Sequence, residues 1–512
     1  MQIYDRTKVV FKDYNFNQNL LLPPSLEELI DPNHPVLVVN QVVDNLNLDP
    51  ILAKYDGGGC PAYHPRMMLK VLVYGYVTNR YSSRKIEEAL HQNIHFMWLS
   101  GMSYPDHNTI NRFRSDRLKS VLREVFSQVV HLLIDHGHIT LKEAYLDGTK
   151  IEANANRYTF VWGKAIRNSR DRIQRQLEEL WSYAEQVAKE ELEHNEPESF
   201  EEIDAEKVSK AIEQIDQALA GKEVDKKVKQ KLNYARKSWP EALNKYEEYE
   251  QQLGERNSLS KTDPDATFMT MKDDHMRNGQ LKPAYNWQIS TQNQYILGYT
   301  LHQTTTDTAT LPIHMDSLRE SLGEMPEVLV ADAGYGSEEN YEYLENNDIE
   351  AYVKFNYFHK EQGNKWKENP AKLENLYYNE QEDCYICPMG QRMKLIKEST
   401  RKTSNGYLQE KKSYQAQNCS GCPMRGPCHE QKTNRIIEVN PRLVRYKQMV
   451  RDKLNSEIGL QYRSQRPVDV EAVFGSVKYN HGFDRFLLRG LEKTEIEAGL
   501  ISLAHNLRKM AN

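Results

Sequence analysis

The sequence contains no apolar segment long enough to cross a bilayer. A membrane-spanning helix needs about 20 predominantly apolar residues, whereas the mean hydropathy of this chain is -0.76. The first residues, MQIYDRTKVVFKDYNF, also lack the apolar core of a secretory signal. We therefore expect a cytoplasmic protein with no membrane partner.

Cysteine is scarce, and its distribution argues against a disulfide framework. Of six cysteines, five lie between positions 384 and 428. Without a secretion signal, such a cluster favours metal binding or reduced thiols over disulfides. Two CxxC pairs followed by a fifth cysteine suit a tetrahedral Zn²⁺ site, and the candidate ligands are Cys384, Cys387, Cys419, Cys422 and Cys428. The spacing leaves open which four would bind zinc, and reduced thiols are the alternative.

The chain also lacks an excess of positive charge. Its 67 Lys and Arg residues stand against 73 Asp and Glu, which gives a net charge of -6. Taken alone, this balance disfavours a nucleic-acid partner. The charge is uneven, however, because segment 165–258 is rich in Glu whereas NPRLVRYKQMVRDK at 440–453 is basic. Any site for a polyanion must therefore be local.

Residues 1–125 are predicted to form an N-terminal helical domain. Ser82 and Asp106 suit helix N-caps. The last of three short helices carries Arg112 and Arg114, an arrangement similar to a helix-turn-helix. That interpretation assigns both arginines to DNA binding, while a helical bundle with a solvated basic face explains the pattern equally well.

The remaining pattern predicts an α/β fold. Strand-like segments occur at 143–152, 284–290, 295–303, 328–331 and 349–356. Without a helical segment at 165–260, the order is strand, strand, strand, helix, strand, helix, strand. This order fits a ribonuclease-H-like core, formed by residues 140–164, 265–356 and the helical stretch 440–512. Apolar spacings of three, four and seven predict a helical hairpin or coiled coil at 165–260, and the Cys-rich segment 357–435 is a second insertion.

Two aspartates lie where apolar runs end, each beside a glycine: Asp147 in EAYLDGTKIE and Asp332 in VLVADAGYGS. Carboxylates at neighbouring strand ends repel one another, and a hard cation such as Mg²⁺ removes that conflict. A single strand-end Asp is more often a turn residue or a cap, so a third carboxylate is needed. The candidate is Glu471, on a helix predicted at 466–480 with Pro467 in its first turn. Lys478 lies two turns further along the same face.

Other polar and aromatic residues near these strands are assigned no chemistry. His302 and Asp307 lie near the third strand and could support the ligands of a metal site, although we assign neither of them a role. Trp287 and Tyr335 could stack on a flipped base, although aromatic residues in such positions are more often part of the core.

These motifs resemble the transposases of bacterial insertion sequences, of the DDE class with a ribonuclease-H-like core. The likeness rests on HPRMMLKVLVYGY, PDHNTINRFR, LDGTKIEANA, VADAGYGS and VEAVFGSVKYN, so it extends over nearly the whole chain. In the branch with a Tyr-Arg-Glu-Lys signature, the matching residues are Tyr462, Arg466, Glu471 and Lys478. The Tyr-to-Arg and Arg-to-Glu intervals are each one residue longer than the expected pattern, which makes Arg463 an alternative to Arg466.

The resemblance implies a mechanism and partners. Asp147, Asp332 and Glu471 would hold two Mg²⁺ (or Mn²⁺) ions, one activating water or a DNA 3′-hydroxyl and the other stabilising the leaving oxygen. Tyr462, Arg463, Arg466 and Lys478 would contact the DNA. The enzyme would bind terminal inverted repeats, cleave at the element's ends and join them to target DNA, as a homodimer on double-stranded DNA at the nucleoid.

One alternative is a catalytically inactive or domesticated relative that acts as a DNA-binding regulator. Another is a two-carboxylate hydrolase such as a glycosidase, which leaves the basic residues around Glu471 unexplained.

Overall fold

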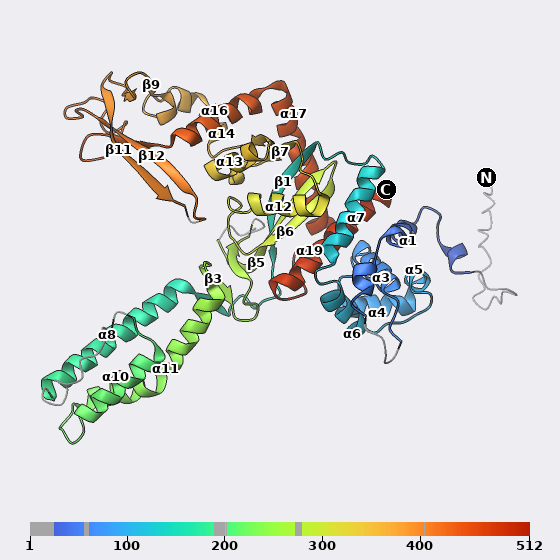
Figure 1. Cartoon of the computed structure of the whole chain (residues 1–512), viewed down its shortest axis with the longest axis horizontal. Coiled ribbons are helices and arrows are strands. Elements are labelled where there is room, and N and C mark those ends of the chain that lie inside the picture. Colours follow the sequence, from blue (N-terminus) through green and yellow to red (C-terminus); the bar gives the residue numbers. More distant parts are fainter. Residues whose placement is uncertain are drawn as a thin grey trace, which may run out of the picture.

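The computed structural model describes residues 25–55, 61–188, 200, 202–271, 279–403 and 405–511. An α/β unit lies at its centre, flanked by an N-terminal helical unit, a long helical arm and a second, antiparallel sheet (Figure 1). The mixed α/β class predicted from the sequence is confirmed. The N-terminal stretch MQIYDRTKVVFKDYNF and Cys60 lie outside the described residues. Within the described ranges, no helix combines the length and apolar character needed to cross a membrane.

The N-terminal unit is built from short capped helices. His34 and His64 each cap a helix that has proline in its first turn, where the missing N–H is not needed. The Asp106 carboxylate accepts a hydrogen bond from the backbone N–H of Thr109, as its predicted capping role requires, whereas Ser82 stands at an N-cap without a side-chain bond. The elements are η1 (Glu27–Leu29), α1 (Pro35–Asn45), α2 (Asp49–Leu52), α3 (Pro65–Val77), α4 (Ser83–Gln92), α5 (Ile94–Leu99), α6 (His107–Arg112), the π-helical turn η2 (Phe113–Arg117) and α7 (Leu122–Asp135).

The central sheet contains both parallel and antiparallel strands. Its order is β4-β5-β1-β7-β8, with β6 also paired to β5. Strand β1 runs antiparallel to β5 and parallel to β7, which is in turn parallel to β8. The strands are β1 (Glu143–Glu152), β4 (Thr267–Thr270), β5 (Leu281–Gln292), β6 (Tyr295–His302), β7 (Val328–Ala331) and β8 (Glu350–Val353). With α12 (Leu311–Leu322) between β6 and β7 and α13 (Glu338–Asn346) between β7 and β8, the predicted succession of elements is present.

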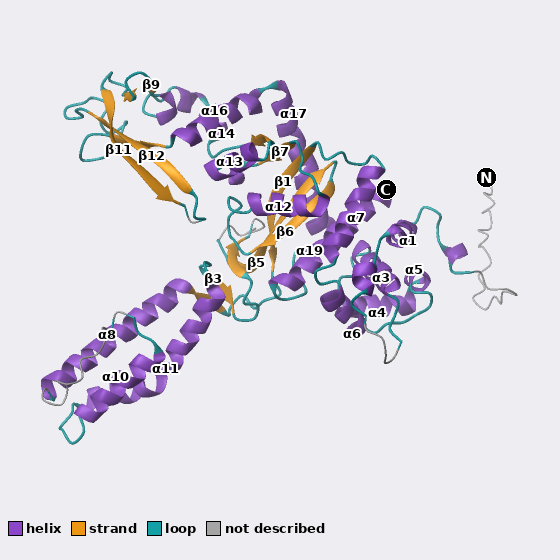
Figure 2. Ribbon diagram, in the orientation of Figure 1, coloured by secondary structure: helices purple, strands orange, loops and turns teal. Residues whose placement is uncertain are grey.

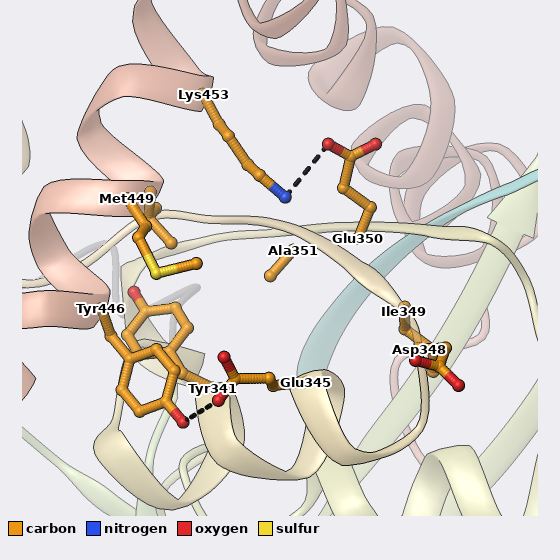
Figure 3. A pocket seen from close by; sticks show the side chains of 10 residues that line it. Tyr341, Glu345, Asp348, Ile349, Glu350, Ala351, Tyr446, Met449 and Lys453 are labelled. Carbon is orange, nitrogen blue, oxygen red and sulfur yellow. Dashed lines mark hydrogen bonds and ion pairs between the residues drawn. The ribbon is translucent and has the colours of Figure 1, made fainter. Parts of the chain in front are cut away.

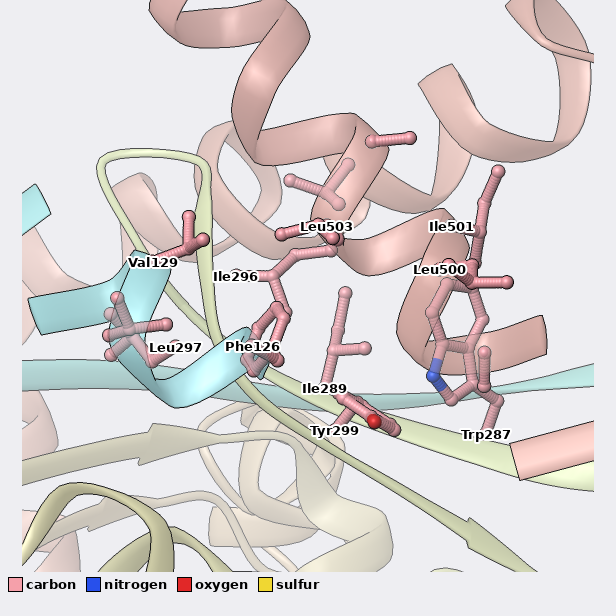
Figure 4. Close-up of a cluster of buried hydrophobic side chains, with 14 of the residues drawn as sticks. Phe126, Val129, Trp287, Ile289, Ile296, Leu297, Tyr299, Leu500, Ile501 and Leu503 are labelled. Atoms are coloured by element: carbon pink, nitrogen blue, oxygen red, sulfur yellow. The ribbon is translucent and has the colours of Figure 1, made fainter. Parts of the chain in front are cut away.

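Helices cover the sheet, which explains why its strands read as continuous apolar runs. Helix α19 (Leu491–Ala511) packs its Leu500, Ile501 and Leu503 side chains over Trp287, Ile289 and Ile296 of the sheet, while Phe126 and Val129 come from α7 (Figure 4). Trp287 and Tyr335 are fully buried, so neither can stack on a base in this structure, and both are core residues as preferred from the sequence.

A helical arm extends from a two-stranded ribbon (Figure 2). The ribbon pairs β2 (Phe160–Trp162) with β3 (Ser258–Ser260), and the arm consists of α8 (Gly163–Val187), α10 (Ala205–Ala218) and α11 (Lys226–Leu253). Its apolar residues form a separate core, which includes Leu177, Leu180, Ile212 and Ile215 at the predicted spacings. The described residues of this segment form three helices, whereas a helical hairpin or coiled coil was predicted, and the chain turns back between α10 and α11.

The Cys-rich segment forms an antiparallel sheet of order β13-β12-β11-β10-β9. It follows the short helices α14 (Phe358–Glu361) and α15 (Asn364–Lys367) and the turn η4 (Leu373–Asn375). The strands are β9 (Tyr377–Asn379), β10 (Cys384–Ile386), β11 (Arg392–Lys402), β12 (Leu408–Ala416) and β13 (Ile436–Val439). This sheet has its own small core around Met393 and Tyr414, separate from the core of the central unit.

The C-terminal helices differ from the prediction in one respect. Helix α16 (Pro441–Asn455) is followed by a nearly continuous helical run: α17 (Glu457–Arg466), the π-helical turn η5 (Pro467–Glu471), α18 (Ala472–Gly475) and a second π-helical turn η6 (Ser476–Asn480). The helix that carries Glu471 therefore begins at Glu457, not near position 466, and Pro467 lies inside the run. Proline has no N–H to donate within a helix, and a local π turn is a usual accommodation of such an interruption.

Candidate active site

The register of the sheet brings two aspartates together. Leu146 of β1 is paired with Ala331 of the parallel strand β7, so Asp147 and Asp332, the next residues of each chain segment, lie side by side where the pairing of these two strands ends. Strand β1 itself continues to Glu152 along β5, so Asp147 lies within a strand rather than at the predicted strand end. Each carboxylate also binds a nearby backbone amide: the N–H of Gly148 lies 2.9 Å from Asp147 Oδ1, and that of Gly334 lies 2.8 Å from Asp332 Oδ1. Asp147 is buried, whereas the Asp332 side chain is 40% exposed.

Glycines leave room around these carboxylates. A Cβ atom at Gly148 would lie only 2.1 Å from Nε2 of Gln288, and one at Gly334 would lie 3.0 Å from Asp332 Oδ1. Gly336 lies against the backbone of the neighbouring strand. A Cβ there would lie 2.3 Å from the backbone oxygen of Lys354, so Gly336 allows the turn after β7 to pack against the end of β8.

Glu471 joins the two aspartates through Arg466. The Arg466 guanidinium lies 3.2 Å from Asp147 Oδ2, 3.9 Å from Asp332 Oδ2 and 2.7 Å from Glu471 Oε1. The Arg466 side chain is only 6% exposed, while that of Glu471 is 52% exposed. The structure thus brings the three predicted carboxylates around a single cation, and it does so from two neighbouring strands and a helix.

The π-helical turn accounts for the long Arg-to-Glu interval. In an α-helix a residue stands above the residue four positions before it, whereas a π turn places residues five apart in that relation. Arg466 and Glu471 are five residues apart, the turn η5 lies between them, and their side chains are hydrogen-bonded. The additional residue therefore leaves Arg466 and Glu471 facing the same site, and Arg466 rather than Arg463 is the arginine of the carboxylate cluster.

Burial and charge perturb two neighbours of this cluster. The pKa of Tyr335 is raised, first because the hydroxyl is fully buried and then because Asp307, Asp147 and Asp332 are near it. The pKa of Lys354 is lowered, mainly by burial and then by the positive charges of Arg466 and Arg463, against the opposing effect of Asp332 and Glu471. The site therefore gathers several carboxylates and several cations at the same end of the sheet.

The other predicted DNA contacts occupy varied positions. Tyr462 packs edge-on against the rings of Tyr145 and Tyr352, so it braces α17 on the sheet. Arg463 donates to the backbone oxygen of Leu454 and stacks over Phe358. Lys478 is half-buried in η6.

Arg112 and Arg114 have opposite environments. Arg112 is exposed at the end of α6. Arg114 is 3% exposed and donates hydrogen bonds to the hydroxyl of Tyr76 and the backbone oxygen of Tyr81. The prediction that Arg114 binds DNA is corrected, because its guanidinium is buried and hydrogen-bonded within the helical core. The buried Glu497 provides a negative charge near it.

Two residues of the site were missed from the sequence. Lys354 directly follows β8, and Asp307 lies in the loop after β6. Both come after strands, as Asp332 does after β7, so the ends of the predicted strands were the signal that could have identified them. Asp147, in contrast, lies within β1, just beyond the part of β1 that pairs with β7. The sequence contains many such polar strand ends, and only the sheet order shows which of them meet.

The carboxylate cluster has the donor chemistry of a divalent-cation site. Its ligand atoms are hard oxygens, and the glycine cradles leave space that a Cβ would fill. Within the described residues, no group of three or more His, Cys, Asp or Glu side chains is arranged to hold a metal ion as it stands. The Arg466 guanidinium explains this at the carboxylates, since it lies among them where a metal ion would have to bind.

Of the five clustered cysteines, four lie together and one lies apart. Four of them line one small cavity together with His429, namely Cys387, Cys419, Cys422 and Cys428. Cys384 is not part of that lining, and its thiol lies 3.7 Å from the carboxylate of Glu382. All five are free cysteines.

Polar groups already point at the sulfurs of this cavity. The backbone N–H groups of Gln391 and Arg435 donate to the sulfurs of Cys387 and Cys419, and Nη1 of Arg435 lies 3.0 Å from the sulfur of Cys428. Both ring nitrogens of His429 are buried without a hydrogen-bond partner among the described residues. Thiol sulfur and imidazole nitrogen are the donor types of structural zinc sites.

A larger pocket lies elsewhere and contains no predicted catalytic residue. It has a volume of about 250 Å³ and is formed by α13, β8 and α16 (Figure 3). Tyr446 donates to Glu345 and Lys453 pairs with Glu350 at its walls. Because the polar groups of its walls already bind one another, we assign it no chemistry.

Two family models match the chain. One, described as a transposase DDE domain, matches residues 386–511, which include Arg466, Glu471 and Lys478. The other, described as a transposase domain (DUF772), matches residues 24–116, the greater part of the N-terminal helical unit. No curated protein and no solved structure matches the chain significantly.

Proposed function

From the membership of this chain in the DDE class of insertion-sequence transposases, we propose that it binds the terminal inverted repeats of an insertion sequence, cleaves the DNA at those ends and joins them to target DNA. One observation carries the proposal. Asp147, Asp332 and Glu471, far apart in the sequence, converge on the buried guanidinium of Arg466. Carboxylates gathered in this way need a cation, and phosphoryl transfer is a reaction that such a site supports.

We propose that Asp147, Asp332 and Glu471 hold two divalent ions, Mg²⁺ or Mn²⁺. When bound, the ions would supply positive charge to the oxygens of the transferring phosphoryl group. The chain's own residues have separate tasks. Arg466 keeps the carboxylates together before the ions bind and then becomes free to contact a DNA phosphate, beside Lys354 and Lys478. Such contacts position DNA without reading its sequence.

The same proposal assigns roles to the other parts of the chain. Residues 140–164, 265–356 and 440–512 would form a ribonuclease-H-like catalytic core, which the order of elements in the central sheet supports. Segments 165–260 and 357–435 would be insertions in that core, and residues 1–125 would bind DNA, with Arg112 as one contact. Two ends must be processed together, so we propose a homodimer on DNA in the cytoplasm, at the nucleoid.

Cleavage of a labelled duplex carrying the element's own terminus tests the proposal. The intact protein should nick at the terminus in Mg²⁺, whereas Asp332→Asn should bind the duplex with unchanged affinity and not cut it. Asp171→Asn, an exposed aspartate on the arm, is the matched control and should cut normally. If the intact protein binds the terminus but does not nick it in Mg²⁺ or Mn²⁺, the alternative of a DNA-binding regulator is favoured. Equal cutting by the intact protein and Asp332→Asn would contradict the assignment of the site.

We also propose a structural zinc ion held by Cys387, Cys419, Cys422 and Cys428. Their shared cavity and the N–H groups directed at the sulfurs support this choice among the five candidates. The thiols would have to turn toward one point to bind the ion. Metal analysis of the purified protein should find a single zinc ion per chain, which Cys422→Ser loses and Cys384→Ser retains. Zinc loss in Cys384→Ser, or a zinc-free intact protein, would contradict the assignment.

A further inference from the structure

A fourth carboxylate lies at the candidate active site. Asp307 follows β6, and its Oδ1 atom would lie 2.9 Å from a Cβ atom placed at Gly148, the neighbour of Asp147. Its Oδ2 atom would lie 3.5 Å from a Cβ atom at Gly334, and the same point is 3.0 Å from Asp332 Oδ1. Asp307 therefore flanks both glycines of the site, between the two aspartates already described.

A buried amide clamp holds this carboxylate in place. Asp307 Oδ1 accepts hydrogen bonds from Asn286 Nδ2 at 2.7 Å and from Gln288 Nε2 at 2.9 Å. Both amides belong to β5 and are almost completely buried, and the hydroxyl of Tyr335 donates to Gln288 Oε1. Buried amides are unfavourable in a sheet unless they are hydrogen-bonded, so their arrangement around one oxygen is specific.

The second oxygen of Asp307 is left for another partner. Within the described ranges, Oδ2 makes no hydrogen bond or ion pair, and it is the oxygen directed toward Gly334 and Asp332. The side-chain oxygen of a neutral asparagine could accept the same two hydrogen bonds from Asn286 and Gln288. A carboxylate here instead adds a negative charge beside Asp147 and Asp332, which raises the electrostatic energy of the site unless a cation binds.

We propose that Asp307 is a fourth acidic ligand of the divalent-ion site, and that Asn286 and Gln288 are positioning residues that direct its Oδ2 atom toward the ion. This inference rests on the proposed function, because it assigns a residue to the same site. Asp307 belongs to the loop between β6 and α12, so it would bring a ligand from a part of the chain separate from those that carry Asp147, Asp332 and Glu471.

The test compares Mn²⁺ binding by the full-length protein and by Asp307→Asn, measured by calorimetry and by the paramagnetic signal of free Mn²⁺. Asparagine retains an oxygen for the amide clamp and removes the charge, so affinity should fall about 10-fold or more, the range seen when groups around a metal are altered. Glu320→Gln, an exposed residue on α12, is the matched control and should bind Mn²⁺ normally. Equal Mn²⁺ affinity in Asp307→Asn and the intact protein would overturn the inference.

Thermal unfolding in EDTA separates a ligand from a structural anchor. If Asp307 is a ligand, Asp307→Asn should be at least as stable as the intact protein without metal, because one of several close negative charges is removed. A clear loss of stability in EDTA would mean that the carboxylate only anchors its loop, and would overturn the inference. Failure of the intact protein itself to bind Mn²⁺ would overturn the proposed function and this inference together, whereas nicking and Mn²⁺ binding that are insensitive to Asp307→Asn would overturn the inference alone.

Discussion

Replacement of Arg466 by glutamine should make the protein depend on a divalent ion for stability. In the metal-free protein, the Arg466 guanidinium contacts Asp147, Asp332 and Glu471. Asp147 is 7% exposed at its side chain, so removal of its cation breaks a buried ion pair, which costs about 3–5 kcal/mol. Asp332 and Glu471 are 40% and 52% exposed, and solvent screening limits each of their contributions to about 0–1 kcal/mol.

The expected loss of stability for Arg466→Gln in EDTA is therefore roughly 3 kcal/mol, dominated by Asp147. For a domain of about 150–250 residues, 1 kcal/mol shifts the unfolding temperature by roughly 2–4 °C, so Tm should fall by about 6–12 °C. Added Mg²⁺ should restore most of this loss, since an ion that binds only the folded state stabilises it by about 2.7 kcal/mol at 100 times its Kd.

The assay is thermal unfolding of the intact protein and the variant, each with EDTA and with Mg²⁺. The intact protein should gain less from Mg²⁺ than Arg466→Gln does, because the ion must first displace the guanidinium. Arg463→Gln is the matched control on the same helix, and its response to Mg²⁺ should equal that of the intact protein. If Arg466→Gln is as stable as the intact protein in EDTA, or if Mg²⁺ stabilises both equally, the guanidinium does not substitute for a metal ion and the reasoning fails.

Three further predictions concern other parts of the chain. Asp469 accepts hydrogen bonds from Thr291 and Gln294 through one oxygen, and burial raises its pKa. The folded state therefore binds the proton of Asp469 more tightly than the unfolded state does. As a result, the free energy of unfolding decreases as pH rises above the ordinary carboxyl range. Asp469→Asn should therefore be more stable than the intact protein at pH 7, with an advantage that disappears below about pH 4; an advantage independent of pH in denaturant titrations would contradict this. Arg114→Gln should lose about 3–5 kcal/mol in chemical unfolding because it strips a buried cation from near Glu497, whereas the exposed Arg112→Gln should stay within about 0.5 kcal/mol, and similar losses in both would refute the difference. Replacement of residues 164–256 by a short turn should leave the central unit folded, because the arm has a separate core and the β2–β3 ribbon closes its base; an unfolded circular dichroism spectrum would show that the arm is needed.

Much of the central unit could be predicted because its signals are local. The strand 143–152 was predicted with its observed bounds, since a run of apolar residues between polar ones is readable without knowledge of its neighbours. The capping role of Asp106 was also readable, because the capping bond spans only three residues. The number of helices in the arm could not be predicted from the sequence, because the apolar spacings of one helix do not indicate where the chain reverses.

The three carboxylates were predicted, but the way in which they are held was not. Asp147, Asp332 and Glu471 were predicted from the ends of apolar runs, neighbouring glycines and a helical face in the sequence. In the structure Asp332 follows β7 as expected, whereas Asp147 lies within β1, which continues to Glu152. The sequence left Arg463 and Arg466 as alternatives, because the interval to Glu471 is one residue longer than expected. A π-helical turn decides between them, since it places Arg466 one turn from Glu471, and no side-chain pattern predicts a π turn reliably.

The sequence by itself determined the chemistry present in this protein: which carboxylates follow apolar runs, which cysteines are spaced for a metal, and where charge accumulates. The tertiary structure alone decided which of those groups meet. Arg114 and Arg112 look alike in the chain, yet one is buried against Tyr76 and the other is exposed. Asp307 could be placed near the third strand from the sequence, but only the structure shows that two amides of β5 bind its carboxylate. The physical reason is that residue types and local periodicity depend on near neighbours, whereas sheet register and burial depend on contacts between residues that are hundreds of positions apart.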